Sequence, residues 1–252
     1  MKEMINITAD AQFDIIIQAG QSNSEGCGIG RAAEEYAENP DILYLNGDFK
    51  IAVAGEAVAG GEKVNNFSLA FAREYVRLGR LAAGRKLLIV RTAVGGTGFC
   101  DARWGPRDDL YLRMLGMTAA ALSLGRDSRL VAYLWHQGET DVIRGASEAL
   151  HYDNLRFLIE SFRAKFFCPG LPFIVGGFVN EWETQNAGIC APVIGAIRGV
   201  CRDIGRAVFV ETEDLQSNNQ DTGNGDIIHF SREALNRLGK RYFEAFSEFF
   251  SH

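Results

Sequence analysis

The sequence predicts an α/β fold of three layers, in which a central, mainly parallel sheet lies between two layers of helices. Short apolar runs rich in β-branched residues alternate along the chain with longer segments of helical periodicity. This alternation is typical of right-handed βαβ units, which build parallel sheets covered on both faces. Three of the apolar runs end abruptly in small and polar residues, as strands do where an open α/β sheet binds its ligand. We interpret residues 1–252 as a single domain.

The first expected strand spans residues 13–19, and the other expected strands are placed around it. Asp14 is its only charged residue, and the three isoleucines that follow suit a strand covered on both faces. Gly20 allows a tight turn directly after this strand. Further strands are expected at residues 42–45, 87–90, 130–135, 173–178 and 207–210, with residues 49–53 pairing back as a hairpin.

Helices are expected between these strands. Residues 67–81 place apolar side chains at helical spacing with arginines on the opposite face, and Ser231 is expected to cap a closing helix. The polar stretches 55–66 and 217–226 are expected to be loops, and residues 31–39 a short helix or loop. The five expected helices span residues 67–81, 110–124, 147–167, 192–204 and 231–250.

The composition argues against several classes of function. The chain has 26 basic and 32 acidic residues, a net charge of −6, with no long run of one sign. We therefore expect neither a nucleic-acid nor a membrane partner. The first apolar run is too short for a signal peptide or a membrane span, which predicts a cytoplasmic location. Five scattered cysteines without C-x-x-C spacing indicate free, buried thiols, and no metal or cofactor is expected.

Four short stretches together hold the residue types that serine acyl transfer needs. Ser22 is the candidate nucleophile, because it stands two residues past Gly20 where a turn exposes its side chain; Ser24 is its competitor. His229 is the candidate general base. Asp226 lies three positions earlier, close enough to reach Nδ1 of His229 and direct Nε2 toward Ser22. The four stretches are residues 20–24, 95–97, 136–139 and 226–229.

The same stretches offer donors for an oxyanion. The backbone N–H groups of Ser22 and of Gly95 or Gly96, and the side-chain amide of Gln137, are the candidates. Glu139 has three possible roles: orienting His229 in place of Asp226, binding substrate hydroxyls, or forming a structural ion pair with an arginine such as Arg91 or Arg103. We favour the ion pair.

The remaining histidines and two aromatic residues are assigned structural roles. His136 is interpreted as scaffold or pocket lining, and His151 and His252 as surface residues. Phe99 and Trp104 follow the Gly95 stretch; they are candidates for a platform under a sugar ring, although ordinary packing is the favoured interpretation.

The ordered motifs resemble a known superfamily. The set GQSN, GGT, HQGE-T-D and D-x-x-HF, spanning residues 20–230, is similar to the SGNH-hydrolase superfamily. The likeness is to its sialate O-acetylesterase-like and acetylxylan-esterase-like branch, that is, to carbohydrate esterases of family 6 type. Residues 55–66 lack the G-P-E type element that many relatives carry, which leaves the substrate open.

The resemblance implies a three-layer α/β/α fold and metal-free hydrolysis of O-acetyl groups on carbohydrates. It implies that Ser22 is the nucleophile, that Asp226 and His229 complete a triad, and that Gln137 replaces an asparagine of the wider superfamily. In some members the glutamate corresponding to Glu139 is the orienting acid. The expected partner is a small-molecule or oligosaccharide acetyl ester, and the oligomeric state is left open. A catalytically silent carbohydrate-binding protein on the same fold is the alternative.

Overall fold

A seven-stranded sheet forms the centre of the computed structural model, which describes residues 10–250. Its strand order is β3-β2-β6-β1-β7-β8-β9, and every neighbouring pair is parallel except β2 with β3. The strands of this sheet are β1 (Gln12–Gly20), β2 (Ile42–Leu45), β3 (Ile51–Val53), β6 (Arg85–Arg91), β7 (Arg129–His136), β8 (Phe173–Gly176) and β9 (Ala207–Val210).

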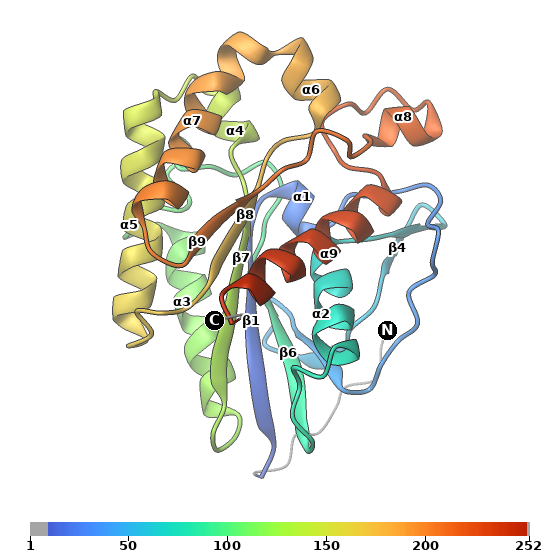
Figure 1. Ribbon diagram of the computed structural model, residues 1–252, viewed down its shortest axis with the longest axis vertical. Helices are drawn as coiled ribbons and strands as arrows, with labels where there is room; N and C mark the ends of the chain where they lie inside the picture. Colours follow the sequence, from blue (N-terminus) through green and yellow to red (C-terminus); the bar gives the residue numbers. More distant parts are fainter. Residues whose placement is uncertain (1–9, 251–252) are drawn as a thin grey trace.

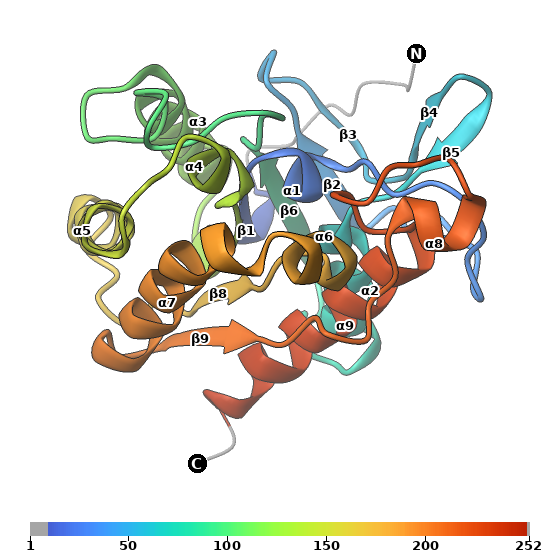
Figure 2. The same cartoon turned by 90° about the horizontal axis from the view of Figure 1, so that it is seen from above.

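Helices cover both faces of the sheet (Figures 1 and 2). The helices α2 (Phe67–Arg77) and α9 (Arg232–Glu248) pack together on one face. The other face carries α3 (Asp109–Ser123), α5 (Glu148–Lys165) and α7 (Ala187–Asp203). The predicted three-layer α/β/α fold is therefore confirmed.

Strand β1 lies in the middle of the sheet, between β6 and β7. Its residues from Phe13 to Gly20 are buried, as the apolar run predicted. Asp14 is buried with them, and its carboxylate accepts hydrogen bonds from Arg85 Nε and Arg129 Nε at 2.7 Å and from the Tyr75 hydroxyl at 2.7 Å. Burial raises the pKa of Asp14, but these donors outweigh it and hold the pKa below its usual value.

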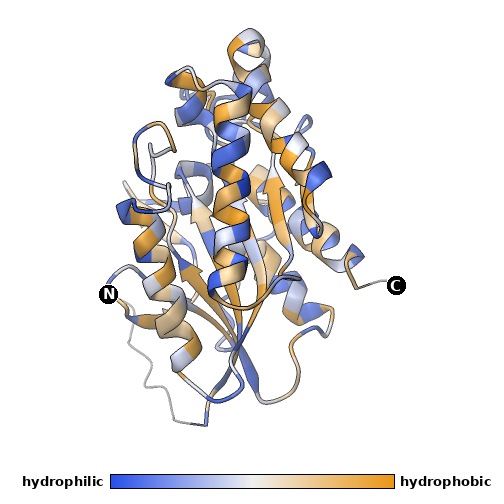
Figure 3. Cartoon of the chain, turned by 90° about the vertical axis from the view of Figure 1, so that its left-hand side faces the viewer, coloured by the Kyte–Doolittle hydropathy of each residue, from blue (hydrophilic) through white to orange (hydrophobic). Residues whose placement is uncertain are grey.

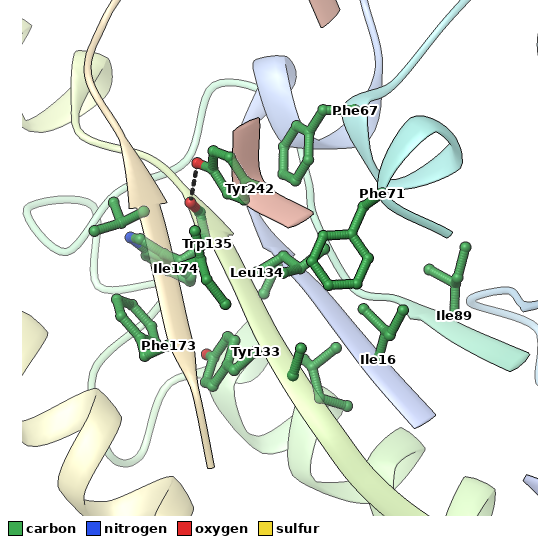
Figure 4. Close-up of a cluster of buried hydrophobic side chains, with 14 of the residues drawn as sticks. Ile16, Phe67, Phe71, Ile89, Tyr133, Leu134, Trp135, Phe173, Ile174 and Tyr242 are labelled. Carbon is green, nitrogen blue, oxygen red and sulfur yellow. Dashed lines mark hydrogen bonds between the residues drawn. The ribbon is translucent and has the colours of Figure 1, made fainter. Parts of the chain in front are cut away.

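The core is rich in aromatic side chains on both faces of the sheet (Figure 4). On the α2/α9 face, Phe67 packs against Tyr242 with ring centroids 4.7 Å apart. The Tyr242 hydroxyl donates to the carbonyl oxygen of Trp135 at 2.9 Å, which ties α9 to the end of β7. Figure 3 shows the hydropathy of the chain, with apolar strands inside and helices that are polar along one side.

The structure differs from the sequence prediction mainly in short elements. Residues 55–66 are not a loop throughout, because β4 (Ala57–Ala59) and β5 (Glu62–Val64) pair as a separate antiparallel hairpin. A helix was expected to start at Pro192, but α7 begins five residues earlier, at Ala187. The proline has no N–H to donate, but its fixed φ is compatible with a helix. Four short helices were not expected: α1 (Ser22–Glu25), α4 (Glu139–Ile143), α6 (Asn180–Gln185) and α8 (Asn218–Thr222).

Two global expectations concern membranes and cysteines. No helix within residues 10–250 is both long and apolar enough to cross a membrane. All five cysteines are free, but only Cys190 is fully buried and Cys100 is exposed, so the expectation of uniformly buried thiols was wrong. Cys100 is exposed because it lies in the loop between β6 and α3 rather than in a strand.

Candidate active site

The turn after β1 brings Ser22 to the carboxyl edge of the sheet. Gly20 has φ +120°, and a Cβ at this position would lie 2.0 Å from the carbonyl oxygen of His136, so only glycine fits here. The N–H of Gln21 donates to that same carbonyl at 2.9 Å. The chain then leaves the sheet and α1 begins at Ser22, near the centre of the molecule above β1 (Figure 2).

The loop before α9 carries His229 to the hydroxyl of Ser22. Nε2 of His229 lies 2.9 Å from Oγ of Ser22. Nδ1 of His229 lies 2.9 Å from Oδ2 and 3.0 Å from Oδ1 of Asp226. The backbone N–H of His229 also donates to Oδ1 of Asp226 at 3.2 Å. The three-residue spacing therefore forms a local turn that aims the imidazole, and the three side chains form one continuous chain of contacts.

Asn218 stabilises the charge on Asp226. Its Nδ2 donates to Oδ2 of Asp226 at 3.0 Å and to the carbonyl oxygen of Cys27 at 2.9 Å. Partial burial alone would raise the pKa of Asp226, but the hydrogen bonds from Asn218 and His229 outweigh it and lower the pKa. Asp226 therefore carries a negative charge at neutral pH and can accept a hydrogen bond from Nδ1 of His229. Asn218 was not predicted as a site residue, because nothing in its local sequence pattern marks it.

Asn23, the residue after Ser22, joins the two halves of the site. Its Nδ2 donates to Oε1 of Glu139 at 2.7 Å and to the carbonyl oxygen of Ile228 at 3.0 Å. Its Oδ1 accepts from the N–H of Phe230 at 3.0 Å. The asparagine thus holds the backbone on both sides of His229. Its place in the GQSN motif was the only signal for it in the sequence.

Glu139 is fully buried behind Asn23, at the start of α4. Besides the bond to Asn23, its Oε1 lies 3.7 Å from Nε2 of His136, a distance longer than a hydrogen bond. Burial would raise the pKa of Glu139, but His136 and the Asn23 amide outweigh it and lower the pKa. Glu139 has a structural environment, but the expected ion pair with an arginine was wrong. Arg91 donates instead to the carbonyl of Glu25, and Arg103 pairs with Asp109.

Gly95, in the loop after β6, packs against Ser22. A Cβ on Gly95 would lie 3.6 Å from Cβ of Ser22, whereas one on Gly96 would meet nothing within 4 Å. Gly96 has φ +68°, a conformation that favours glycine. The N–H of Gly95 donates to Oε2 of Glu25 at 2.7 Å. Of the two glycines, Gly95 is the one that lies against Ser22.

Asp141 holds the other end of this loop. Its two carboxylate oxygens accept from the N–H groups of Phe99 at 3.2 Å and Cys100 at 2.8 Å, and from Nε2 of Gln137 at 2.9 Å. Nδ1 of His151 lies 3.2 Å from the same carboxylate. Burial would raise the pKa of Asp141, but His151 and these donors outweigh it and lower the pKa.

His151 lies differently from what the sequence suggested, and Gln137 has a partner that the sequence did not indicate. His151 is buried, not on the surface, because the inward face of α5 also carries Leu155, Leu158 and Phe162. This i, i+4, i+7 spacing was a usable signal. The Gln137 amide has donated one N–H to Asp141, so one N–H is left for another acceptor. His252 lies outside the described residues.

The aromatic residues after Gly98 belong to the core. Trp104 is almost completely buried, packs against Trp135 at a centroid distance of 5.0 Å, and donates from Nε1 to Thr97 Oγ1 at 3.0 Å. Phe99 packs against Trp135 and His151. Both act as packing residues under the loop, and Trp104 presents no surface to a sugar. Within residues 10–250, no group of three or more His, Cys, Asp or Glu side chains is placed to hold a metal ion.

Comparison with known proteins identifies a family model that matches residues 12–248, described as "Carbohydrate esterase, sialic acid-specific acetylesterase". A curated relative from Arabidopsis thaliana, a probable carbohydrate esterase, is 25% identical over 222 residues, covering 84% of this chain and 76% of that protein. The resemblance read from the four ordered motifs is confirmed by the family match.

Solved structures show the same architecture. The X-ray structure of the Arabidopsis thaliana protein superposes with a TM-score of 0.75 at 25% identity, covering 93% of this chain and 98% of that one. The crystal structure of NanS gives 0.79 at 18% identity, with 97% and 99% covered. A carbohydrate acetylesterase from Xanthomonas citri gives 0.59 at 15% identity, with 92% and 55% covered. The last two are similar in fold.

Proposed function

Because this chain belongs to the sialic acid-specific acetylesterase family of carbohydrate esterases, we propose that it hydrolyses O-acetyl esters on carbohydrates with Ser22 as nucleophile. The observation that carries the proposal is the unbroken chain from Ser22 Oγ through His229 to Asp226, with contacts of 2.9 Å on each side of the imidazole. A hydroxyl attacks an ester at neutral pH only when a neighbouring base removes its proton. The substrate is a small-molecule or oligosaccharide acetyl ester.

The reaction has two halves. Oγ of Ser22 attacks the acetyl carbonyl carbon while Nε2 of His229 takes the hydroxyl proton. The tetrahedral intermediate then expels the sugar oxygen, which leaves as a hydroxyl with the proton from His229. Water next gives a proton to His229 and attacks acetyl-Ser22. His229 returns that proton to Oγ of Ser22 as acetic acid leaves, which restores the free enzyme; the acid then loses its own proton to solvent.

Asp226 is the residue that orients His229 in this proposal. Its carboxylate accepts from Nδ1 and so fixes the tautomer that has Nε2 facing Ser22. Glu139 acts one step further away, because it holds Asn23 and Asn23 holds the backbone on both sides of His229. We therefore assign Glu139 a positioning role.

The oxyanion is proposed to bind to backbone N–H groups beside Ser22. Ser22 is the first residue of α1, so its N–H has no acceptor within the helix. Gly95 supplies the second donor, because it packs against Ser22 while Gly96 points to open space. The unused N–H of Gln137 is the third candidate. Removing one such donor typically lowers kcat by about 10²–10³-fold.

The decisive experiment compares Ser22→Ala with Ser24→Ala for acetate release from p-nitrophenyl acetate and from acetylated sugars. We expect Ser22→Ala to lose at least about 10³-fold in kcat, as loss of a nucleophile does. Ser24 lies two positions after Ser22 and is buried. Ser24→Ala is therefore the matched control and should keep most of the activity. Full activity in a folded Ser22→Ala protein would disprove the mechanism. No acetate release by the wild type, combined with measurable sugar binding, would favour a silent carbohydrate-binding protein.

A further inference from the structure

The carboxylate of Glu25 accepts the backbone hydrogen bond of Gly95, the glycine that lies against Ser22. Its Oε2 accepts from the N–H of Gly95 at 2.7 Å. Glu25 and Ser22 are the last and first residues of α1, three positions apart, so their side chains share one side of the helix. A Cβ on Gly95 would lie 3.1 Å from Oε2 of Glu25 and 3.6 Å from Cβ of Ser22. The three residues therefore form one cluster at the rim of the site.

Glu25 is an exposed side chain whose charge is not neutralised by an ion pair. In the part of the chain that the structure describes, no lysine or arginine lies within ion-pair distance of its carboxylate. Arg91 is close by, but its guanidinium donates to the backbone carbonyl of Glu25 at 2.6 Å and lies over the ring of Tyr44 at 4.7 Å. The negative charge is thus presented to whatever approaches Ser22.

This arrangement restricts which esters are stabilised at Ser22. A developing oxyanion and the Glu25 carboxylate cannot both accept the single N–H of Gly95, and their like charges repel each other. The carboxylate must therefore turn away before Gly95 can donate to the oxyanion. A hydroxyl or ammonium group next to the acetyl ester offers it a new donor, whereas a carboxylate on the substrate adds a second repulsion.

We propose that Glu25 is a specificity-determining residue that favours acetyl esters of neutral or amino sugars over acetyl esters of acidic sugars. The inference rests on the proposed esterase function and deepens it by naming the substrate class. It separates this chain from an enzyme specific for sialic acids, because those sugars carry a carboxylate.

The test uses three acetylated sugars of nearly the same shape: mono-O-acetylated glucuronamide, glucuronate and glucosamine, which are neutral, anionic and cationic. The wild type is expected to prefer the amide over the glucuronate by about five- to tenfold in kcat/KM, with glucosamine at least as good as the amide. Glu25→Gln keeps the size and the acceptor but removes the charge, so its preference should fall to within about twofold. On p-nitrophenyl acetate its kcat should rise several-fold, because the oxyanion no longer meets a carboxylate.

Glu160→Gln is the matched control, because Glu160 lies on α5 and pairs with Arg156 at the surface. It should leave all three kcat/KM values unchanged. Equal turnover of the three sugars by the wild type, or a Glu25→Gln variant with the wild-type preference, would overturn the specificity proposal while leaving the esterase intact. Wild-type protein that releases acetate from none of the sugars and not from p-nitrophenyl acetate would overturn both proposals.

Discussion

Nδ2 of Asn23 donates to Oε1 of Glu139 at 2.7 Å, which joins the residue after Ser22 to a carboxylate 116 positions later. The bond explains why two acidic residues near one histidine have different roles. Glu139 faces Asn23 and His136 from inside the protein, while Asp226 faces His229 from the partly exposed rim. Glu139 thus holds Asn23 in place, while Asp226 contacts the imidazole of His229 directly.

Asp226→Asn should therefore mainly lower activity, and Glu139→Gln should mainly lower stability. Asp226→Asn should lower kcat by about 10³–10⁴-fold, because the amide no longer fixes the correct tautomer of His229. It should change the melting temperature little, because Asp226 is partly exposed. Glu139→Gln should retain kcat within about tenfold but destabilise the fold by about 1–3 kcal/mol, the usual cost of disturbing a buried charged hydrogen bond. Kinetics and thermal melts of both variants test this, and the reverse pattern would make Glu139 the orienting acid.

Asp14 should be a major contributor to stability at neutral pH. Asp14→Asn leaves Arg85 and Arg129 without their carboxylate, and we expect a loss of about 3 kcal/mol in urea unfolding. The pKa of Asp14 is lowered in the fold, so its contribution is present above the unfolded pKa of about 3.9 and is lost as pH falls through the folded pKa.

The stability of the Asp14→Asn variant should consequently depend less on pH in that acid range than the stability of the wild type does. Asp41→Asn is the control, since Asp41 forms an exposed pair with Lys86 and should change stability by less than about 1 kcal/mol. Equal losses in the two variants would show that the buried cluster adds nothing beyond a surface pair.

Gly20→Ala should damage both the fold and the site. The added Cβ would lie 2.0 Å from the carbonyl oxygen of His136, so β1 and β7 must separate where Ser22 leaves the sheet. We expect a loss of at least about 3 kcal/mol and a kcat reduced by tenfold or more. Gly60→Ala has a positive φ of 60° but meets nothing within 4 Å, and its cost should be about 1 kcal/mol with unchanged kcat. Melting curves and kinetics of the pair separate the steric contact from the φ effect.

Asp141→Asn should loosen the loop that carries Gly95. The variant loses the charge that accepts from the N–H groups of Phe99 and Cys100, and we expect a destabilisation of about 2 kcal/mol. The kcat should fall by about tenfold with KM little changed, because the N–H of Gly95, a proposed oxyanion donor, is displaced. Asp101 lies in the same loop and pairs with Arg144 at the end of α4, so Asp101→Asn is the control. A kcat as high as that of the control would limit Asp141 to a stabilising role.

Much of this arrangement could be predicted, because it depends on local patterns. Apolar runs with β-branched residues located all the parallel strands, and Gly20 followed by Ser22 marked the turn at the sheet edge. The D-x-x-H spacing placed a carboxylate on Nδ1 because three residues in a turn bring the two side chains together.

The remaining features depend on contacts between distant segments, which one sequence does not encode locally. Asn23 and Glu139 meet only because β1 and β7 are neighbours in the sheet, and the partner of Gln137 depends on how α4 folds back. The hairpin at residues 57–64 was missed because its strands are short and mostly exposed, so they lack an apolar face. The burial of His151, by contrast, could have been read from the spacing of the apolar residues in α5.

Ser22 and His229 are separated by 207 positions, and this distance sets the order of events during synthesis. A nascent chain exposes the Ser22 hydroxyl long before residues 226–229 are made, so the imidazole that would activate it is still missing. In the proposed mechanism, hydrolysis begins only after the loop before α9 has left the ribosome and α9 has docked through Tyr242 on the end of β7. Recovery of esterase turnover during refolding would thus report when α9 docks. A chain cut short before α9 would be inert toward esters.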